Sequence, residues 1–440
     1  MNINSRVFLG SSLKDSSIPS PKQSPIVTLP GTFGVSHTNL LIDEDILSKH
    51  VLFMGGTGCG KTNTFYYFVD QIKKKMTNND VMIIFDTKGD FFKKFYSSST
   101  DKVLSNSKQY LSVTDKWNVF KEISADGWND IDIVNNTNEL TMSIFQEAIQ
   151  KNSSNPFFPN AARDLLAALI ICITRAGIND ALFKKKHFYN KELRDFLNVA
   201  DAVSIANILK SENDLGAVLN YIGDGTTAQA LGVMAEMQNV IRQIFVGSFA
   251  DTGHFSIRNF VRNKGGKTLF IEYDLSMGSL LTPIYRLFFD LALKEALGRN
   301  KSEGNVYLIC DEFKLLPNLQ HIDDGVNFGR SLGVKVLAGL QSIEQLYEIY
   351  GDSRGRNIAA GFSTIFAFKA NDPSTREYVS KLYGKNIMLE QYQLANNSYV
   401  EEKRDGNTVE DWDMNELAVG EAIVGLPFQK PFKYKVDIFK

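Results

Sequence analysis

Cysteine and histidine are scarce in this chain of 440 residues, and their scarcity excludes some classes of chemistry. The three cysteines, Cys59, Cys172 and Cys310, are far apart and odd in number, which argues against a disulfide framework or a zinc cage. The five histidines are equally scattered. The composition therefore points away from metal or thiol chemistry carried by these residue types.

The chain also lacks an excess of charge of one sign. Lys and Arg number 48 against 50 Asp and Glu, so the net charge is −2 and no global basic field exists. Any nucleic-acid contact must then use a local patch or an interior groove. Lys73–Lys75 and Lys184–Lys186 are short basic runs, and such runs are typically solvated helix faces.

Long hydrophobic runs are missing as well. The first 15 residues contain no apolar core of a secretory signal. The longest apolar run, Leu165–Ile173, is about half as long as a bilayer-spanning helix must be. These absences predict a cytoplasmic protein without direct membrane insertion.

What is present is an ordinary globular composition, 43% hydrophobic and 22% charged, in a chain longer than one average domain. Residues 11–25 hold six Ser and three Pro, so residues 1–37 are predicted to form an N-terminal arm or linker. Six later runs are apolar on both faces, as strands buried between two helix layers must be. They are Val51–Met54, Val81–Phe85, Thr268–Tyr273, Val306–Cys310, Val334–Leu340 and Thr364–Phe368. The pattern predicts an α/β fold with a mostly parallel sheet.

Between the second and third of these runs the pattern becomes helical. Asn160–Ala176 is amphipathic and is followed by Gly177, Asn190 can cap Lys191–Leu197, and Thr227–Phe245 has apolar residues, including Leu231, at helical spacing. A return helix is signalled from Thr282-Pro283 to Leu297. We therefore predict a nucleotide-binding domain at 38–134 and 263–440, interrupted by an all-helical insertion at 135–262. The polar stretch 396–415 is predicted to be a surface excursion.

The clearest motif is a glycine-rich loop after the first buried strand. Residues 55–62 fit the P-loop pattern at every fixed position and precede a helical segment, Asn63–Met76. Its glycines let backbone N–H groups face phosphate oxygens, while Lys61 should reach the β- and γ-phosphates and Thr62 should bind Mg²⁺. The predicted nucleotide-binding residues are Gly55, Gly56, Thr57, Gly58, Cys59, Gly60, Lys61, Thr62 and Asn63.

Polar residues at the ends of two other strands can complete a hydrolytic site for ATP. Asp311 and Glu312 follow Val306–Cys310, so Asp311 is a candidate for holding Mg²⁺ through water and Glu312 for polarising the attacking water. A helix N-cap is the plain structural alternative. Gln341 ends the next strand, where its amide can bond the γ-phosphate and the water, or lie idle on the surface.

The 250 residues between Lys61 and Asp311 require a separate domain inside the nucleotide-binding core. This spacing excludes small P-loop kinases and Ras-like GTPases as the default interpretation.

Together these segments resemble the type IV coupling proteins of bacterial conjugation, the TraD/TraG group within the FtsK/HerA-like P-loop superfamily. The resemblance covers about residues 38–440. Its motifs are His50–Thr62, Phe85–Asp90, Asp311–Phe313, Leu316–Leu319, Gly329–Ser331, Gly339–Ser342, Gln345–Leu346, Tyr350–Gly351, Asn371–Thr375 and Leu382–Lys385.

The resemblance implies a RecA-like motor with an inserted all-helical domain. It further implies a hexameric ring that hydrolyses ATP at subunit interfaces and moves DNA through a central channel. Arg330 matches the family's arginine finger, with Arg354 and Arg356 as reserve candidates. Members usually begin with transmembrane helices, and this sequence shows none, so any membrane association is expected to be peripheral, at the inner face, through a partner such as a relaxase or secretion channel.

Two other functions are open at this point. One is a double-stranded-DNA pump similar to HerA or FtsK, acting with a nuclease in repair, segregation or phage defence. The other is an assembly factor for proteins that uses ATP as a conformational switch. DNA-stimulated turnover would separate the two DNA motors from the assembly factor.

Overall fold

A central sheet of eleven strands forms the body of the protein. The computed structural model describes residues 4–13, 16–298, 303–393 and 398–440. In order across the sheet the strands are β3 (Ser36–Asp43), β2 (Pro25–Phe33), β14 (Phe432–Val436), β13 (Glu421–Gly425), β10 (Thr364–Phe368), β4 (Val51–Met54), β9 (Val334–Leu340), β8 (Val306–Cys310), β5 (Val81–Asp86), β7 (Lys267–Glu272) and β6 (Lys102–Ser105).

The strands from β10 to β6 are all parallel, and those from β13 to β3 are antiparallel. Each of the six predicted apolar runs is one of these parallel strands, and β4, β5, β8, β9 and β10 are buried along their whole length. The α/β fold class with a mostly parallel sheet is therefore confirmed. The other five strands of the sheet, β2, β3, β6, β13 and β14, were not predicted.

Helices cover both faces of the sheet. On one face α2 (Lys61–Lys75) and α3 (Asp90–Phe95) pack Phe65, Phe68 and Phe91 against Val51 and Phe53 of β4. The opposite face, which carries Leu52 and Met54, packs against a larger core. The helices of that face and of the sheet edges are α1 (Glu44–Leu47), α12 (Ile257–Asn263), α13 (Gly278–Leu297), α14 (Ile322–Asn327), α15 (Glu344–Tyr350), α16 (Asp352–Ala360) and α17 (Pro373–Tyr383).

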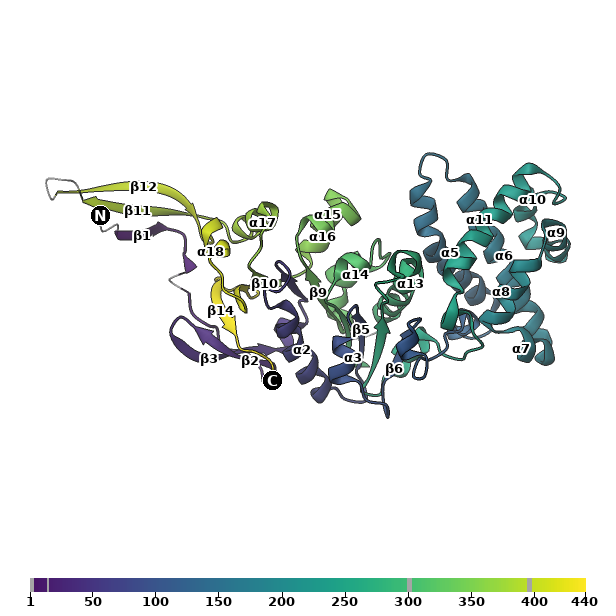
Figure 1. Cartoon of the computed structure of the whole chain (residues 1–440), viewed down its shortest axis with the longest axis horizontal. Coiled ribbons are helices and arrows are strands. Elements are labelled where there is room, and N and C mark those ends of the chain that lie inside the picture. The colour runs from purple at the N-terminus through teal and green to yellow at the C-terminus, as the bar shows by residue number, and fades with distance from the viewer. Residues whose placement is uncertain (1–3, 14–15, 299–302, 394–397) are drawn as a thin grey trace.

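A helical unit lies between β6 and β7 in sequence and at one end of the molecule in space (Figure 1, right). Its helices are α4 (Val119–Ile123), α5 (Asp130–Lys151), α6 (Phe157–Asn179), α7 (Ala181–His187), α8 (Asn190–Val199), α9 (Ala202–Leu209), α10 (Leu219–Ile222) and α11 (Ala228–Ile244). None of the helices that the structure describes is long and apolar enough to cross a membrane.

Several predicted details of these helices are wrong. Gly177 lies inside α6, where a Cβ would meet the Phe188 ring at 2.2 Å, so the glycine serves packing and not a helix end. Asn190 does not cap α8, because its amide donates to the carbonyls of Trp117 and Phe249. Leu231 is 63% exposed and α13 begins at Gly278, four residues before Thr282.

The N-terminal segment 1–37, predicted to be an arm, contains strands. Pro25–Phe33 alternates buried and half-buried residues and pairs with β3, so its period-two pattern prevails over its Ser/Pro-rich surroundings. Near the N-terminus β1 (Asn4–Leu9) pairs with β11 (Lys385–Gln393).

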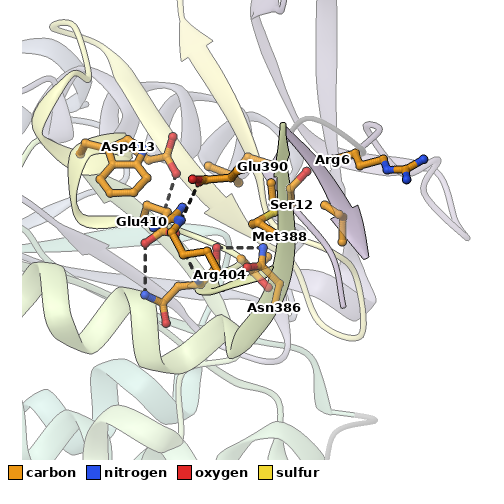
Figure 2. Close-up of a pocket in the computed structure, with 13 residues that line it drawn as sticks. Arg6, Ser12, Asn386, Met388, Glu390, Arg404, Glu410 and Asp413 are labelled. Carbon is orange, nitrogen blue, oxygen red and sulfur yellow. Dashed lines mark hydrogen bonds and ion pairs between the residues drawn. The ribbon is translucent and has the colours of Figure 1, made fainter. Parts of the chain in front are cut away.

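The polar stretch 396–415 holds β12 (Tyr399–Asn407), which pairs with β11, and the short helix α18 (Asp411–Asn415); residues 396 and 397 lie outside the described residues. The hairpin projects from the end opposite the helical unit (Figure 1, left). Beneath it a cavity of about 440 Å³ is crossed by the side chain of Arg404, which donates to Glu390 (2.7 Å) and Glu410 (3.4 Å) (Figure 2). These contacts join the hairpin to α18, whose N-cap is Glu410.

Candidate nucleotide-binding site

The loop between β4 and α2 has a backbone that only glycine adopts easily. Gly55, Gly58 and Gly60 have φ values of +145°, +76° and +112°. A Cβ on Gly60 would also meet the Cα of Gly420 at 2.8 Å. Because a side chain would strain or block the loop at these positions, its peptide groups can approach a ligand closely.

Lys61 and Thr62 begin α2 at the end of this loop. The buried Lys61 ammonium donates to the carbonyl oxygens of Gly55 and, at 3.2 Å, of Gly56, so it lies folded back under the loop. The Thr62 hydroxyl donates to Asp311 Oδ2 at 2.8 Å. Two residues that are 249 positions apart in sequence are thus in direct contact.

Three polar side chains from the carboxyl ends of β8 and β9 complete the site. Burial raises the pKa of Asp311, while the Thr62 hydrogen bond and the charge of Lys61 act in the opposite direction. Gln341 Nε2 donates to Glu312 Oε2 at 3.0 Å, and Thr57 Oγ1 donates to Gln341 Oε1 at 3.5 Å. Glu312 and Gln341 are therefore joined at the ends of two neighbouring strands.

All of these groups line one cavity of about 200 Å³. The lining is Gly56, Thr57, Gly58, Cys59, Gly60, Lys61, Thr62, Asn63, Lys88, Asp311, Glu312 and Gln341. Every predicted nucleotide-binding residue except Gly55 is in this set. Asn63 lies at its margin, with its amide donating to the Asp437 carbonyl at 2.8 Å and accepting from the Phe439 N–H at 2.8 Å.

Lys88 is a lining residue whose role the sequence analysis did not assign. It follows β5 in a tight turn held by Asp86, whose carboxylate accepts N–H groups from Lys88 (3.2 Å), Gly89 (2.9 Å) and Phe92 (3.0 Å). The segment Phe85–Asp90 was recognised only as part of the family resemblance. An isolated Asp-x-Lys gives no signal that β5 ends beside β8.

Glu272, at the end of β7, is a second carboxyl group that sequence reasoning missed. It is paired with Asp86 across the parallel strands and is 2% exposed. Burial first, and the charge of Asp86 second, raise the pKa of Glu272 to about 9. Burial also raises the pKa of Asp86, but the backbone N–H groups that its carboxylate accepts act in the opposite direction, so Glu272 is the carboxyl of the pair that we expect to hold a proton.

The candidate finger arginines lie away from this cavity. Arg330 belongs to a 3₁₀ turn, Gly329–Leu332, just before β9, and donates to Asp45 Oδ1 at 2.9 Å. Since Gln341 follows the other end of β9, the seven-residue strand separates Arg330 from its own P-loop by roughly 20 Å. Arg354 is ion-paired with Asp323 at 2.6 Å, and the exposed Arg356 with Asp352 at 2.9 Å.

The basic run Lys73–Lys75 is engaged within the fold. Lys73 pairs with Asp101, Lys74 pairs with Asp70 at 2.7 Å, and Lys75 donates to the carbonyls of Pro25 and Ile26. Lys73 and Lys75 therefore join α2 to its neighbours, whereas the exposed Lys74 pairs within α2, so the run is only in part the solvated helix face that was expected.

The parallel sheet, the glycine loop and the acids at the neighbouring strand ends define a protein of the RecA-like P-loop class. Comparison with known proteins narrows this class. A family model described as the type IV secretion-system coupling protein DNA-binding domain matches residues 35–427. The chain therefore belongs to the type IV coupling protein family.

One curated relative is the coupling protein TraD of Escherichia coli strain K12. It is 22% identical over 402 residues, which are 88% of this chain and 51% of TraD, so the chain spans about half the length of this relative.

Solved structures of the coupling protein TrwB have the same fold. An unbound monoclinic form of TrwBdeltaN70 has a TM-score of 0.74 and 21% identity, covering 96% of this chain and 90% of that one. TrwB in complex with ADP and Mg²⁺ has a TM-score of 0.70 and 20% identity, covering 96% of both chains. These likenesses confirm the predicted RecA-like fold.

Proposed function

We propose that the chain is an ATP-driven DNA translocase of conjugation, one subunit of a motor that delivers DNA to a type IV secretion channel. The observation that carries the proposal is the contact of Thr62 with Asp311 at 2.8 Å beside the Glu312–Gln341 pair, inside a cavity closed by a P-loop. The membership of the family, whose model describes a DNA-binding domain, supports DNA as the moved substrate.

The residues of the cavity fit ATP with Mg²⁺. Lys61 is a buried ammonium whose bonds go to backbone carbonyls, so its charge is available to the β- and γ-phosphates. Thr62 and Asp311 supply the hydroxyl and carboxylate oxygens that Mg²⁺ prefers. When bound, Mg²⁺ neutralises charge that develops on the phosphates. Binding of the cation also offsets the cost of ionising a carboxyl whose pKa burial has raised.

Glu312 and Gln341 are the groups placed to position water. Glu312 is half-buried and accepts a hydrogen bond from the Gln341 amide. A carboxylate held in this way can accept a proton from a water molecule, and the amide can bond that water or the γ-phosphate. Lys88 adds a second positive charge at the rim, where it favours the ionised form of Asp311.

The proposed motor works as a ring, in which Arg330 acts on the nucleotide of a neighbouring subunit. Its distance from its own P-loop and its exposed position beside Asp45 support a role in trans. The hexamer, the partner relaxase or channel, and a cytoplasmic location with peripheral membrane attachment are parts of this proposal. The family match favours it over a HerA/FtsK-like pump and over a protein assembly factor.

The test of the hydrolytic site is Glu312→Gln. The variant should bind ATP and Mg²⁺ with unchanged affinity, because Lys61, Thr62 and Asp311 stay in place, and its turnover should fall about 100-fold or more. Binding is measured with a fluorescent ATP analogue and turnover by phosphate release. Normal turnover with impaired binding would assign Glu312 to binding and refute its proposed role.

A further inference from the structure

A second polar cavity, in the helical unit, has an unusual set of charges. It measures about 150 Å³ and lies where α4, the end of α7 and the loop before Phe255 meet. Three of its lining residues are Lys121, Lys184 and Lys185, and none of its lining residues is Asp or Glu. We call it the lysine cavity.

The charges of these three lysines are not balanced by nearby acids. In the part of the chain that the structure describes, none of the three forms an ion pair, and the carboxylates near Lys121 and His254 in sequence are engaged elsewhere. Glu122 accepts hydrogen bonds from Trp117 and Ser256. Asp126 pairs with Arg258 and Arg262, and Asp251 pairs with Lys116. Burial and the charge of Lys121 lower the pKa of Lys184, so the cations repel one another when the cavity is empty of anions.

Specific contacts between side chains and loops fix the walls of the cavity. The buried Asn118 amide donates to the carbonyls of Phe188 and Gly253, both at 2.8 Å, which fixes two loops against α4. Phe188 stacks on Phe120 with ring centroids 4.7 Å apart. Lys184 Nζ lies 3.3 Å from the centre of the Trp128 ring, a cation–π contact that holds this ammonium at the cavity.

We propose that the lysine cavity binds a phosphate of the DNA backbone, an inference that rests on the proposed function and gives it a contact point. Three ammonium groups without an ion pair at one hollow favour a multiply bonded oxyanion. Lys121 and Lys185 are exposed and can reach such an anion, while Lys184 rests on the Trp128 ring. The exposed Lys186 continues the run beyond the cavity, where it can meet the next phosphate of a chain. This continuation favours a polyanion over a single free phosphate. The Lys184–Lys186 run was expected to be a solvated helix face. Unlike Lys73 and Lys74, which form ion pairs, it has no ion pair among the described residues.

The experiment compares the full chain with two triple variants that change the net charge equally. One is Lys121→Ala/Lys184→Ala/Lys185→Ala. The control removes three exposed lysines of the same helical unit that do not line the cavity, Lys151→Ala/Lys191→Ala/Lys210→Ala. Binding of fluorescent 30-nucleotide single- and double-stranded DNA is measured by anisotropy between 50 and 200 mM salt, with thermal unfolding to check each fold.

The cavity variant should bind DNA about tenfold or more weakly. Its plot of log affinity against log salt should be shallower by about 0.7 for single-stranded DNA, since the cavity takes one phosphate and each single-strand phosphate contact contributes about 0.7. The control variant should lose much less affinity for DNA. ATP hydrolysis without DNA should be unchanged in both triple variants. If the cavity variant unfolds early, Lys185→Glu, at an exposed position, replaces it and should weaken binding in the same direction.

Equal losses in the two triple variants would overturn the inference while leaving the motor proposal intact. If the unaltered chain bound no DNA, the cavity inference and the motor proposal would both be refuted. Phosphorus NMR of inorganic phosphate, in a Lys61→Ala background that disables the P-loop, separates the sources of the anion. Phosphate binding that the cavity substitutions abolish, together with unchanged DNA binding, would mark a free-anion site and refute the DNA assignment.

Discussion

The raised pKa of Glu272 beside Asp86 leads to a specific prediction of how stability depends on pH. The pKa of Glu272 rises from its ordinary value of 4.5 to about 9 in the folded protein. Between these values the unfolded chain has lost the proton and the native protein keeps it, so native stability falls as pH rises, by about 1.4 kcal/mol per pH unit. From pH 6 to pH 8 this carboxyl alone should cost about 3 kcal/mol.

Glu272→Gln removes the titrating proton but keeps the shape and lets the new amide donate to Asp86. Urea unfolding should therefore show that the free energy of unfolding falls more between pH 6 and pH 8 in the unaltered protein than in the variant. Glu348→Gln, which alters an exposed glutamate on α15, is the control and should follow the unaltered protein. Parallel pH dependence of all three proteins would refute the reasoning, because it would mean that Glu272 is ionised when folded.

Three further substitutions test the nucleotide site and the ring. Lys61→Ala should weaken ATP binding and reduce turnover about 100-fold or more, since the phosphates lose their main cation; turnover within twofold of normal, measured by phosphate release, would rule out the P-loop assignment. Gly60→Ala should destabilise the loop and abolish nucleotide binding, because its Cβ would lie 2.8 Å from the Gly420 Cα and φ is +112°; calorimetry with ATP checks this, and normal affinity would contradict it. Arg330→Ala should bind ATP normally yet lose about 10³-fold or more of DNA-stimulated turnover. Mixing it with Lys61→Ala should restore part of the activity, and mixed rings no more active than the two parents would exclude action in trans.

The sheet could be predicted from sequence as far as its strands are apolar on both faces. The strands Val51–Met54 and Val306–Cys310 can be recognised as continuous apolar runs because a central parallel strand has no solvent face. The antiparallel strand Glu421–Gly425 is also buried along its last four residues, but it was not recognised because it lies close to the polar stretch 396–415. Pro25–Phe33 was hidden by its Ser/Pro-rich surroundings although its alternation is regular.

The same limit applies to the site. Lys61, Thr62, Asp311, Glu312 and Gln341 were found because each follows a predicted strand or belongs to a motif, and strand ends of a parallel sheet share one edge. The pairing of Glu272 with Asp86 depends on β5 lying between β8 and β7. A single sequence gives the strands but not their order, so this pair and the turn of Lys88 could not be foreseen.

The central claim is that this chain couples ATP hydrolysis to DNA, and one measurement tests it most directly. Steady-state phosphate release is followed while single- or double-stranded DNA is added, with Glu312→Gln as the inactive reference. The account predicts that DNA stimulates hydrolysis by the unaltered protein severalfold or more and leaves Glu312→Gln inactive. Hydrolysis that proceeds at the same rate with and without either form of DNA would contradict the account.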